Sequence, residues 1–195
     1  MSSAIVRLAV LLALLSSACA TIGGVADAPH EYLDQSTAAT VTIVDRPLVF
    51  ARERSELAAN ARDYVTLAAA AVDRTGRIDY VLVCYRWSTV DARLDNSPPP
   101  DSDTLVVAAD DRRIELRSPS HSARDLGIGT PVHPPPGPTS SQYVYRVDLS
   151  TLRFIAAARH LRVQLGTGEL APNYDIWTDG RPALGAFVDF LSGPH

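Results

Sequence analysis

The residue types best suited to catalysis gather in one short stretch, which reads RSPSHSARD over residues 117–125. Ser118, Ser120, His121 and Asp125 supply the hydroxyl, imidazole and carboxylate groups of a catalytic triad. In known triads, however, these groups converge from separate segments of the chain, and the sequence contains no G-x-S-x-G motif. We therefore expect no catalytic residues and keep a serine hydrolase only as a remote alternative.

The histidines and cysteines do not have the spacing of a metal site. The five histidines and two cysteines form no H-x-H, H-E-x-x-H or C-x-x-C motif. All 18 basic side chains are arginine, which excludes lysine chemistry such as Schiff-base formation and P-loop phosphate binding. The formal net charge is -4 and the arginines are dispersed, which argues against nucleic-acid binding. We expect no metal, no cofactor and no nucleic-acid partner.

Residues 1–18 have the parts of a signal peptide. Arg7 supplies a positive charge, the apolar run LAVLLALL follows at 8–15, and small residues come next. These eight apolar residues are too few to span a bilayer, which takes about 20. The residues before Thr21 read ACA and fit the A-x-A rule, so cleavage there would leave a soluble periplasmic protein.

A second cleavage site overlaps the first. Residues 15–19 read LSSAC, which resembles the lipobox of bacterial lipoproteins, although Leu15 lies one position farther from Cys19 than is usual in that family. The resemblance implies cleavage before Cys19 and a lipid on its thiol that anchors the protein to a membrane. Because Ala20 and not aspartate follows the cysteine, it further implies the outer membrane, on the periplasmic side.

Composition divides the remaining chain into a tether and a domain. Residues 19–39 contain Gly23, Gly24 and Pro29 without regular hydrophobic periodicity, so we predict a flexible tether there. Residues 40–193 suffice for a single domain with one core. Runs with period-two alternation predict strands at 40–45, 47–53, 63–90 (a hairpin), 104–117 (a hairpin), 142–149, 161–168 and 173–179.

Two helices complete the predicted fold. Asp148 or Ser150 can cap a short helix within 148–159. A second, C-terminal helix has apolar residues at i, i+3, i+4 and i+7 between Pro182 and Gly193. The sequence therefore predicts a mainly-β (α+β) fold, an antiparallel β-sandwich or curled sheet of about eight strands with a short helix and a C-terminal amphipathic helix packed on it.

Two further features bear on function. The proline-rich segment 118–141 is longer than most connections, and we expect a mobile, solvated loop because few apolar residues are available to fix it. A binding loop is the alternative. Cys84 lies in the strand-like run YVLVCYRW, so we expect a buried and unreactive thiol.

Aromatic side chains on the predicted strands are the weak candidates for a binding surface, namely Trp87, Tyr143, Tyr145 and Trp177. Several of them on one exposed face would bind a small ligand, a glycan or a peptide. We expect a membrane-anchored envelope lipoprotein of unknown activity that takes part in interaction or assembly without catalysis, with an envelope protein or glycan as partner. A binding module with an aromatic sheet face is the alternative, and a periplasmic serine hydrolase is the remote one.

Overall fold

The computed structural model describes residues 27–90, 103–118, 122–137 and 140–193. Cys19 and the signal peptide lie outside these residues, as do Ser120 and His121. The strands are β1 (His30–Asp34), β2 (Ala39–Ile43), β3 (Leu48–Glu53), β4 (Arg62–Arg74), β5 (Arg77–Ser88), β6 (Thr104–Ala109), β7 (Arg112–Arg117), β8 (Ser141–Val147), β9 (Leu161–Leu165) and β10 (Asn173–Thr178). The helices are the 3-10 helix η2 (Ala123–Leu126) and the α-helices α2 (Leu149–Ala157) and α3 (Arg181–Ser192).

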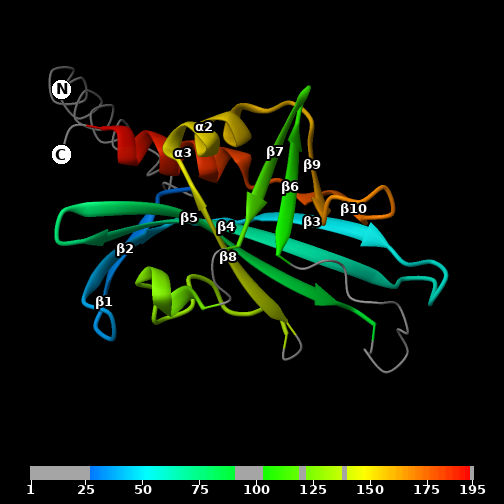
Figure 1. Ribbon diagram of the computed structural model, residues 1–195, viewed down its shortest axis with the longest axis horizontal. Coiled ribbons are helices and arrows are strands. Elements are labelled where there is room, and N and C mark those ends of the chain that lie inside the picture. The colour runs from blue at the N-terminus through cyan, green and yellow to red at the C-terminus, as the bar shows by residue number, and fades with distance from the viewer. Residues whose placement is uncertain (1–26, 91–102, 119–121, 138–139, 194–195) are drawn as a thin grey trace, which may run out of the picture.

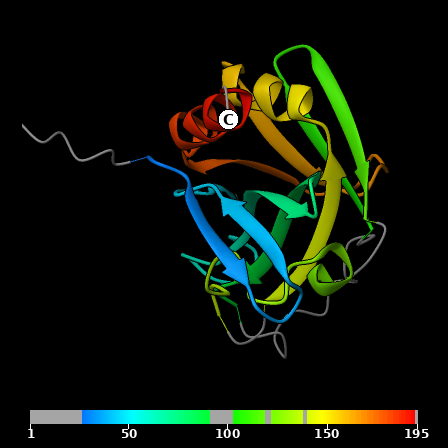
Figure 2. The same cartoon turned by 90° about the vertical axis from the view of Figure 1, so that its left-hand side faces the viewer.

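The strands form one curled antiparallel sheet, a half-barrel, and the predicted fold class is confirmed (Figure 1). The sheet order is β1-β2-β4-β3-β10-β9-β6-β7, with β5 paired to the other edge of β4 and β8 paired to β5. β4 is long enough to pair with two strands along one edge, because β3 covers its first half and β2 its second. End-on, the sheet curls so that β8 approaches β6 and β7 (Figure 2).

The β4–β5 hairpin is the longest element, and its turn matches the sequence-based prediction. Thr75 and Gly76 both have positive φ, and the Gly76 N–H donates to the Asp73 side chain at 2.8 Å. Every residue from Tyr64 to Val72 in the middle of β4 is buried, so both faces of this strand are covered. Alanines at four consecutive positions suit this place, because a small side chain permits close packing on both sides.

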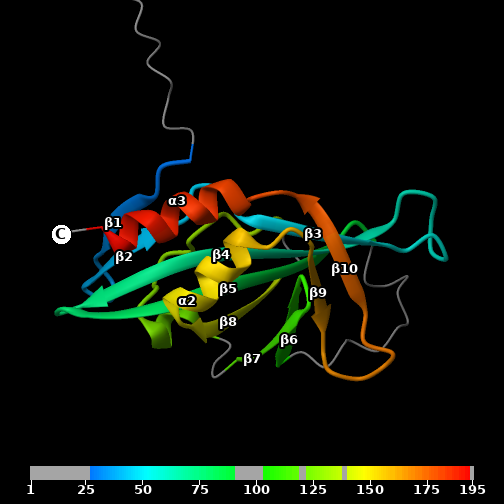
Figure 3. The same cartoon turned by 90° about the horizontal axis from the view of Figure 1, so that it is seen from above.

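The two faces of the hairpin are covered by different segments. The helices α2 and α3 contact each other and lie together on one side of the sheet, whereas η2 lies on the other side (Figures 1 and 2). From above, α3 crosses the sheet near β1 and β2, and α2 lies over β5 (Figure 3). We call the side that the helices cover the inner face and the opposite side the outer face.

Both α-helices begin as their residue types dictate. The Asp148 side chain accepts a hydrogen bond from the Thr151 N–H at 2.6 Å, which makes Asp148 the cap of α2. α3 begins after Gly180 with proline in its first turn. The N-cap residue of α3 is Gly180 and not Asp179. The Asp179 carboxylate lies one residue earlier and accepts a hydrogen bond from the Arg181 N–H at 3.0 Å. Buried Leu184, Phe187 and Val188 fix α3 to the core.

Two sequence-based predictions about loops are wrong for the described residues. The predicted tether 19–39 contains strand β1 and the first residue of β2. The folded domain therefore begins by His30 and not at residue 40. Within the predicted solvated loop 118–141, the described residues 122–137 pack against the outer face through Ala123, Leu126, Ile128 and Val132, all of them buried. Its Gly127 has φ +92° and lies so close to the hairpin that a Cβ there would be 2.9 Å from Val72 Cγ1.

One buried carboxylate joins these two segments. Asp34, at the end of β1, is 1% exposed and accepts four hydrogen bonds. Oδ1 accepts from the Ser36 N–H at 3.0 Å and from its hydroxyl at 2.7 Å. Oδ2 accepts from the N–H groups of Gly129 and Thr130, both at 2.7 Å. We call these four residues the Asp34 clasp, and it ties β1 to a segment about ninety positions later in the chain.

Within the part of the chain that the structure describes, no helix has the length and hydropathy that crossing a bilayer requires.

Candidate functional site

Three aromatic rings and one arginine gather on the outer face, and we call them the aromatic surface (Arg62, Tyr64, Trp87 and Trp177). The Tyr64 and Trp87 rings are stacked, with centroids 4.0 Å apart and an interplanar angle of 7°. The Trp177 ring meets Tyr64 edge-on, at 6.1 Å and 81°. The Arg62 guanidinium lies 4.8 Å from the Trp177 ring centroid, within cation–π distance. Trp177 keeps 56% of its surface exposed.

Strand register places two of these residues together. The turn at 74–77 sets the pairing of β4 with β5, and this register puts Tyr64 directly opposite Trp87. Thr66 lies on the same face and accepts a hydrogen bond from the Trp87 indole N–H at 3.2 Å, which fixes the orientation of the indole ring. Trp87 was predicted from the sequence, whereas Tyr64 was missed. The signal was available, because the predicted hairpin 63–90 contains one turn sequence, DRTGR at 73–77, and residues paired across a turn have a constant sum of sequence numbers.

A β-bulge brings Trp177 to the same place. Ile176 pairs with Phe50 and Thr178 with Val49, so Trp177 is the extra residue on β10. A bulge of this kind redirects a side chain and sharpens the local twist. The result is that Trp177, two strands away from Tyr64 in the sheet, meets its ring edge.

Charged residues around the aromatic surface are paired in opposite sign. The Arg62 guanidinium contacts the Glu53 carboxylate at 3.0 Å, on the neighbouring strand β3. Beyond β3, Arg162 contacts Asp175 at 2.6 Å. Glu53, Asp175 and Arg162 are all more than half exposed. The surroundings therefore offer hydrogen-bond donors and acceptors in equal supply, without an excess of either charge.

The other two predicted binding residues are elsewhere. Tyr143 and Tyr145 pair with Cys84 and Leu82, which places them on the inner face. Tyr145 is 0% exposed, so its prediction as a surface binding residue is wrong. Burial raises the pKa of the Tyr145 phenol, and its hydroxyl, although near Arg86, makes no hydrogen bond of ordinary geometry. Tyr143 is half-buried, with the Arg86 guanidinium 4.2 Å from its ring centroid.

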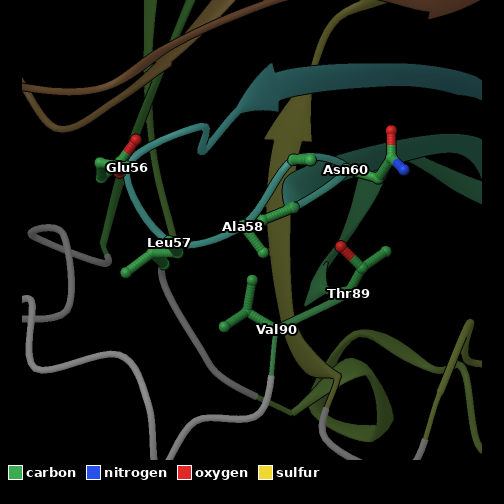
Figure 4. Close-up of a pocket in the computed structure, with 8 residues that line it drawn as sticks. Glu56, Leu57, Ala58, Asn60, Thr89 and Val90 are labelled. Carbon is green, nitrogen blue, oxygen red and sulfur yellow. The ribbon is translucent and has the colours of Figure 1, made fainter.

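An open pocket of about 700 Å³ lies beside Arg62 of the aromatic surface. Figure 4 shows the side chains that line this pocket. The β3–β4 loop and the end of β5 line it, through Glu56, Leu57, Ala58, Ala59, Asn60, Ala61, Thr89 and Val90. The two lining segments are joined to each other next to the aromatic surface, because the Arg62 N–H donates to the Thr89 hydroxyl at 2.9 Å. The lining is mostly apolar, and the Glu56 carboxylate forms an ion pair with the Arg54 guanidinium at 2.5 Å. Such a pocket can bind part of a ligand, but its lining contains a single ionisable side chain, Glu56, for acid–base catalysis.

The residues considered for catalysis or metal binding have structural roles where they are described. The Ser118 hydroxyl donates to the Val144 carbonyl at 3.0 Å, and His133 Nε2 lies 3.0 Å from the Val44 carbonyl. Cys84 is buried, and burial raises the pKa of its thiol to about 12. Among the described residues, no group of three or more His, Cys, Asp or Glu side chains could hold a metal ion.

Comparison of the chain with protein-family models, with curated proteins and with solved structures finds no match. The function must therefore be argued from the residues themselves.

Proposed function

We propose that the chain is a lipid-anchored protein of the bacterial envelope that binds a partner through its aromatic surface and catalyses no reaction. The aromatic surface carries this proposal. An exposed indole with a stacked Tyr64–Trp87 pair behind it is a large, rigid contact area that loses little conformational freedom on binding. Adjacent Arg62 and Glu53 would orient a partner through hydrogen bonds.

The anchor rests on the sequence around Cys19. The eight residues from Ala20 to Asp27 could extend at most about 28 Å, since an extended chain spans about 3.5 Å per residue. Asp27 is itself held to the domain by an ion pair with Arg46. A lipid on Cys19 would therefore keep the domain next to the membrane, and its aromatic surface would meet partners fixed in the envelope.

Photo-cross-linking in living cells tests the binding function for a partner of any chemical class. We would replace Trp177 by benzoylphenylalanine, whose aromatic ketone keeps a flat ring at this position. The matched control carries the same group at Leu33, which is 65% exposed on β1, the first strand of the sheet order and four strands away from β10. We expect a light-dependent adduct from position 177 and not from position 33, seen as a discrete band for a protein partner or as retention with the insoluble cell wall for a glycan. Equal labelling from both positions, or none from either, would contradict a binding role for the aromatic surface.

A further inference from the structure

We infer that the aromatic surface binds a glycan strand, and that the strand belongs to the cell wall that faces the anchored domain. This inference rests on the proposed function and names the ligand class. A pyranose ring has an apolar C–H face and a rim of hydroxyl groups. It therefore needs a flat aromatic surface with hydrogen-bonding groups at its edge.

The aromatic surface meets the first requirement. Trp177 is the exposed ring, and Tyr64 of the stacked Tyr64–Trp87 pair meets it at 81°. The Arg62 guanidinium lies over the Trp177 ring, and 56% of the Trp177 surface is still exposed to solvent. A ring held in this way can stack on a sugar without reorganising first.

The surrounding residues meet the second requirement. Glu53 with Arg62, and Asp175 with Arg162, place carboxylate acceptors beside guanidinium donors on adjoining strands. Sugar hydroxyls donate and accept, and acetamido groups do the same, so both kinds of partner are used. The 700 Å³ pocket beside Arg62 adds room for a substituent or for a neighbouring sugar of the same strand.

Charge distinguishes this ligand from the competing ones. A polyanion such as nucleic acid requires an excess of positive charge, whereas the charges here are paired. A proline-rich peptide docks in a groove lined by several aromatic side chains, whereas Tyr64 is buried and Trp87 only partly exposed, which leaves Trp177 as the exposed ring. A chain of sugar rings, with its hydroxyl and acetamido groups, fits the remaining combination of an exposed aromatic ring and oppositely charged pairs at its edge.

The position of the domain selects the source of the glycan. With a lipid on Cys19, the eight residues from Ala20 to Asp27 hold Asp27, where the described domain begins, within about 28 Å of the membrane, and the domain extends from there. On the periplasmic side of the outer membrane, the polysaccharide that such a domain faces is the cell wall. The aromatic surface would then fasten the wall to a lipid-anchored protein without a covalent bond.

Co-sedimentation with purified cell-wall sacculi tests the inference. The lipidated full chain, extracted in detergent, would be mixed with insoluble sacculi and centrifuged over a range of sacculus concentrations. We expect saturable sedimentation of the wild type and of Leu33→Ala, and about tenfold weaker binding of Trp177→Ala, because truncating an aromatic anchor typically has this effect. Trp177→Phe keeps a flat ring and should bind within about threefold of the wild type. Unchanged unfolding midpoints for all variants would show that the fold is intact.

Two results would overturn the inference. The wild type could stay in the supernatant, or Trp177→Ala could sediment as well as the wild type. If the wild type stays in the supernatant while position 177 still cross-links a partner in cells, the glycan assignment is wrong and the binding function stands. If position 177 also yields no adduct, both are wrong.

Discussion

Replacing Asp34 by alanine should strongly destabilise the fold, because this buried carboxylate joins β1 to the segment 122–137. The carboxylate is 1% exposed and accepts four hydrogen bonds, two from Ser36 and one each from the N–H groups of Gly129 and Thr130. Alanine removes every acceptor at once. The segment 122–137 then loses its polar attachment to β1 and keeps only its apolar contacts with the outer face.

The magnitude follows from the donors that remain. Leaving a buried donor without a partner costs about 1–3 kcal/mol, and alanine leaves three N–H groups without theirs, those of Ser36, Gly129 and Thr130. We therefore expect Asp34→Ala to lower the free energy of unfolding by about 3–5 kcal/mol. Asp34→Asn should cost less, about 2–3 kcal/mol, because its amide oxygen still satisfies two of the four donors.

Urea unfolding followed by circular dichroism measures this effect. With a slope of about 2 kcal/mol per molar urea, the midpoint of Asp34→Ala should fall by about 2 M. Gly129→Ala should disrupt the same clasp in a different way, because a Cβ at this position would lie 1.8 Å from the Ser36 hydroxyl oxygen. A midpoint that falls by less than about 0.5 M in Asp34→Ala, at unchanged slope, would refute this account of the clasp.

The clasp also predicts a pH dependence. The hydrogen bonds of Ser36 and of the Gly129 and Thr130 N–H groups hold the pKa of Asp34 well below its usual range. A carboxyl whose pKa is lower in the folded state stabilises the fold above the unfolded pKa, about 3.9, and loses this contribution as pH falls below it. The wild type should therefore begin to lose stability as the pH falls through about 4, and should go on losing it down to the lowered pKa of the folded state. Asp34→Asn should lose less over the same range, and parallel curves for the two proteins would contradict the assignment.

Three other predictions concern Tyr145, Cys84 and Cys19. Tyr145→Phe removes a buried hydroxyl without a well-formed hydrogen bond, so the urea midpoint should stay equal or rise, whereas a loss above about 1 kcal/mol would mean that the hydroxyl is partnered. The Cys84 thiol, with its pKa raised to about 12 by burial, should resist a thiol reagent at pH 8 until the protein is unfolded; rapid labelling of the native protein would show that the core is open. The full chain should incorporate radiolabelled palmitate in cells, and Cys19→Ser should not; an unlabelled wild type beginning at Thr21 would exclude the anchor.

The strands were predictable because their signals are local. Period-two alternation identified the β4–β5, β6–β7 and β9–β10 hairpins, and the Asp148 cap identified α2. The segment 122–137 was not predictable because its few apolar residues have no regular spacing. It is fixed instead by Gly127, which permits close approach to Val72, and by Asp34, whose distant position in the chain no local pattern reveals.

Two of the four residues of the aromatic surface, Trp87 and Trp177, were predicted from the sequence, whereas Tyr64 and Arg62 were not. Alternation assigns Tyr145 to one face of β8, but it does not tell which face the helices will cover. Trp87 and Trp177 could be named as aromatic residues on strands, but their meeting through Tyr64 depends on the order of β5, β4, β3 and β10 and on a bulge. Arg62 was missed because its role comes only from its place over the Trp177 ring.

Tryptophan fluorescence offers the sharpest measurement, because the only two tryptophans of the chain both lie in the aromatic surface. Soluble glycan strands released from the cell wall would be added to the purified lipidated protein in detergent while its emission is recorded. We predict a saturable change in intensity or wavelength in the wild type and in Leu33→Ala. Trp177→Ala, which retains Trp87 as a reporter, should need about tenfold more glycan for the same response. No change in wild-type emission at any concentration, or an unaltered titration in Trp177→Ala, would contradict the proposal that this surface binds glycan.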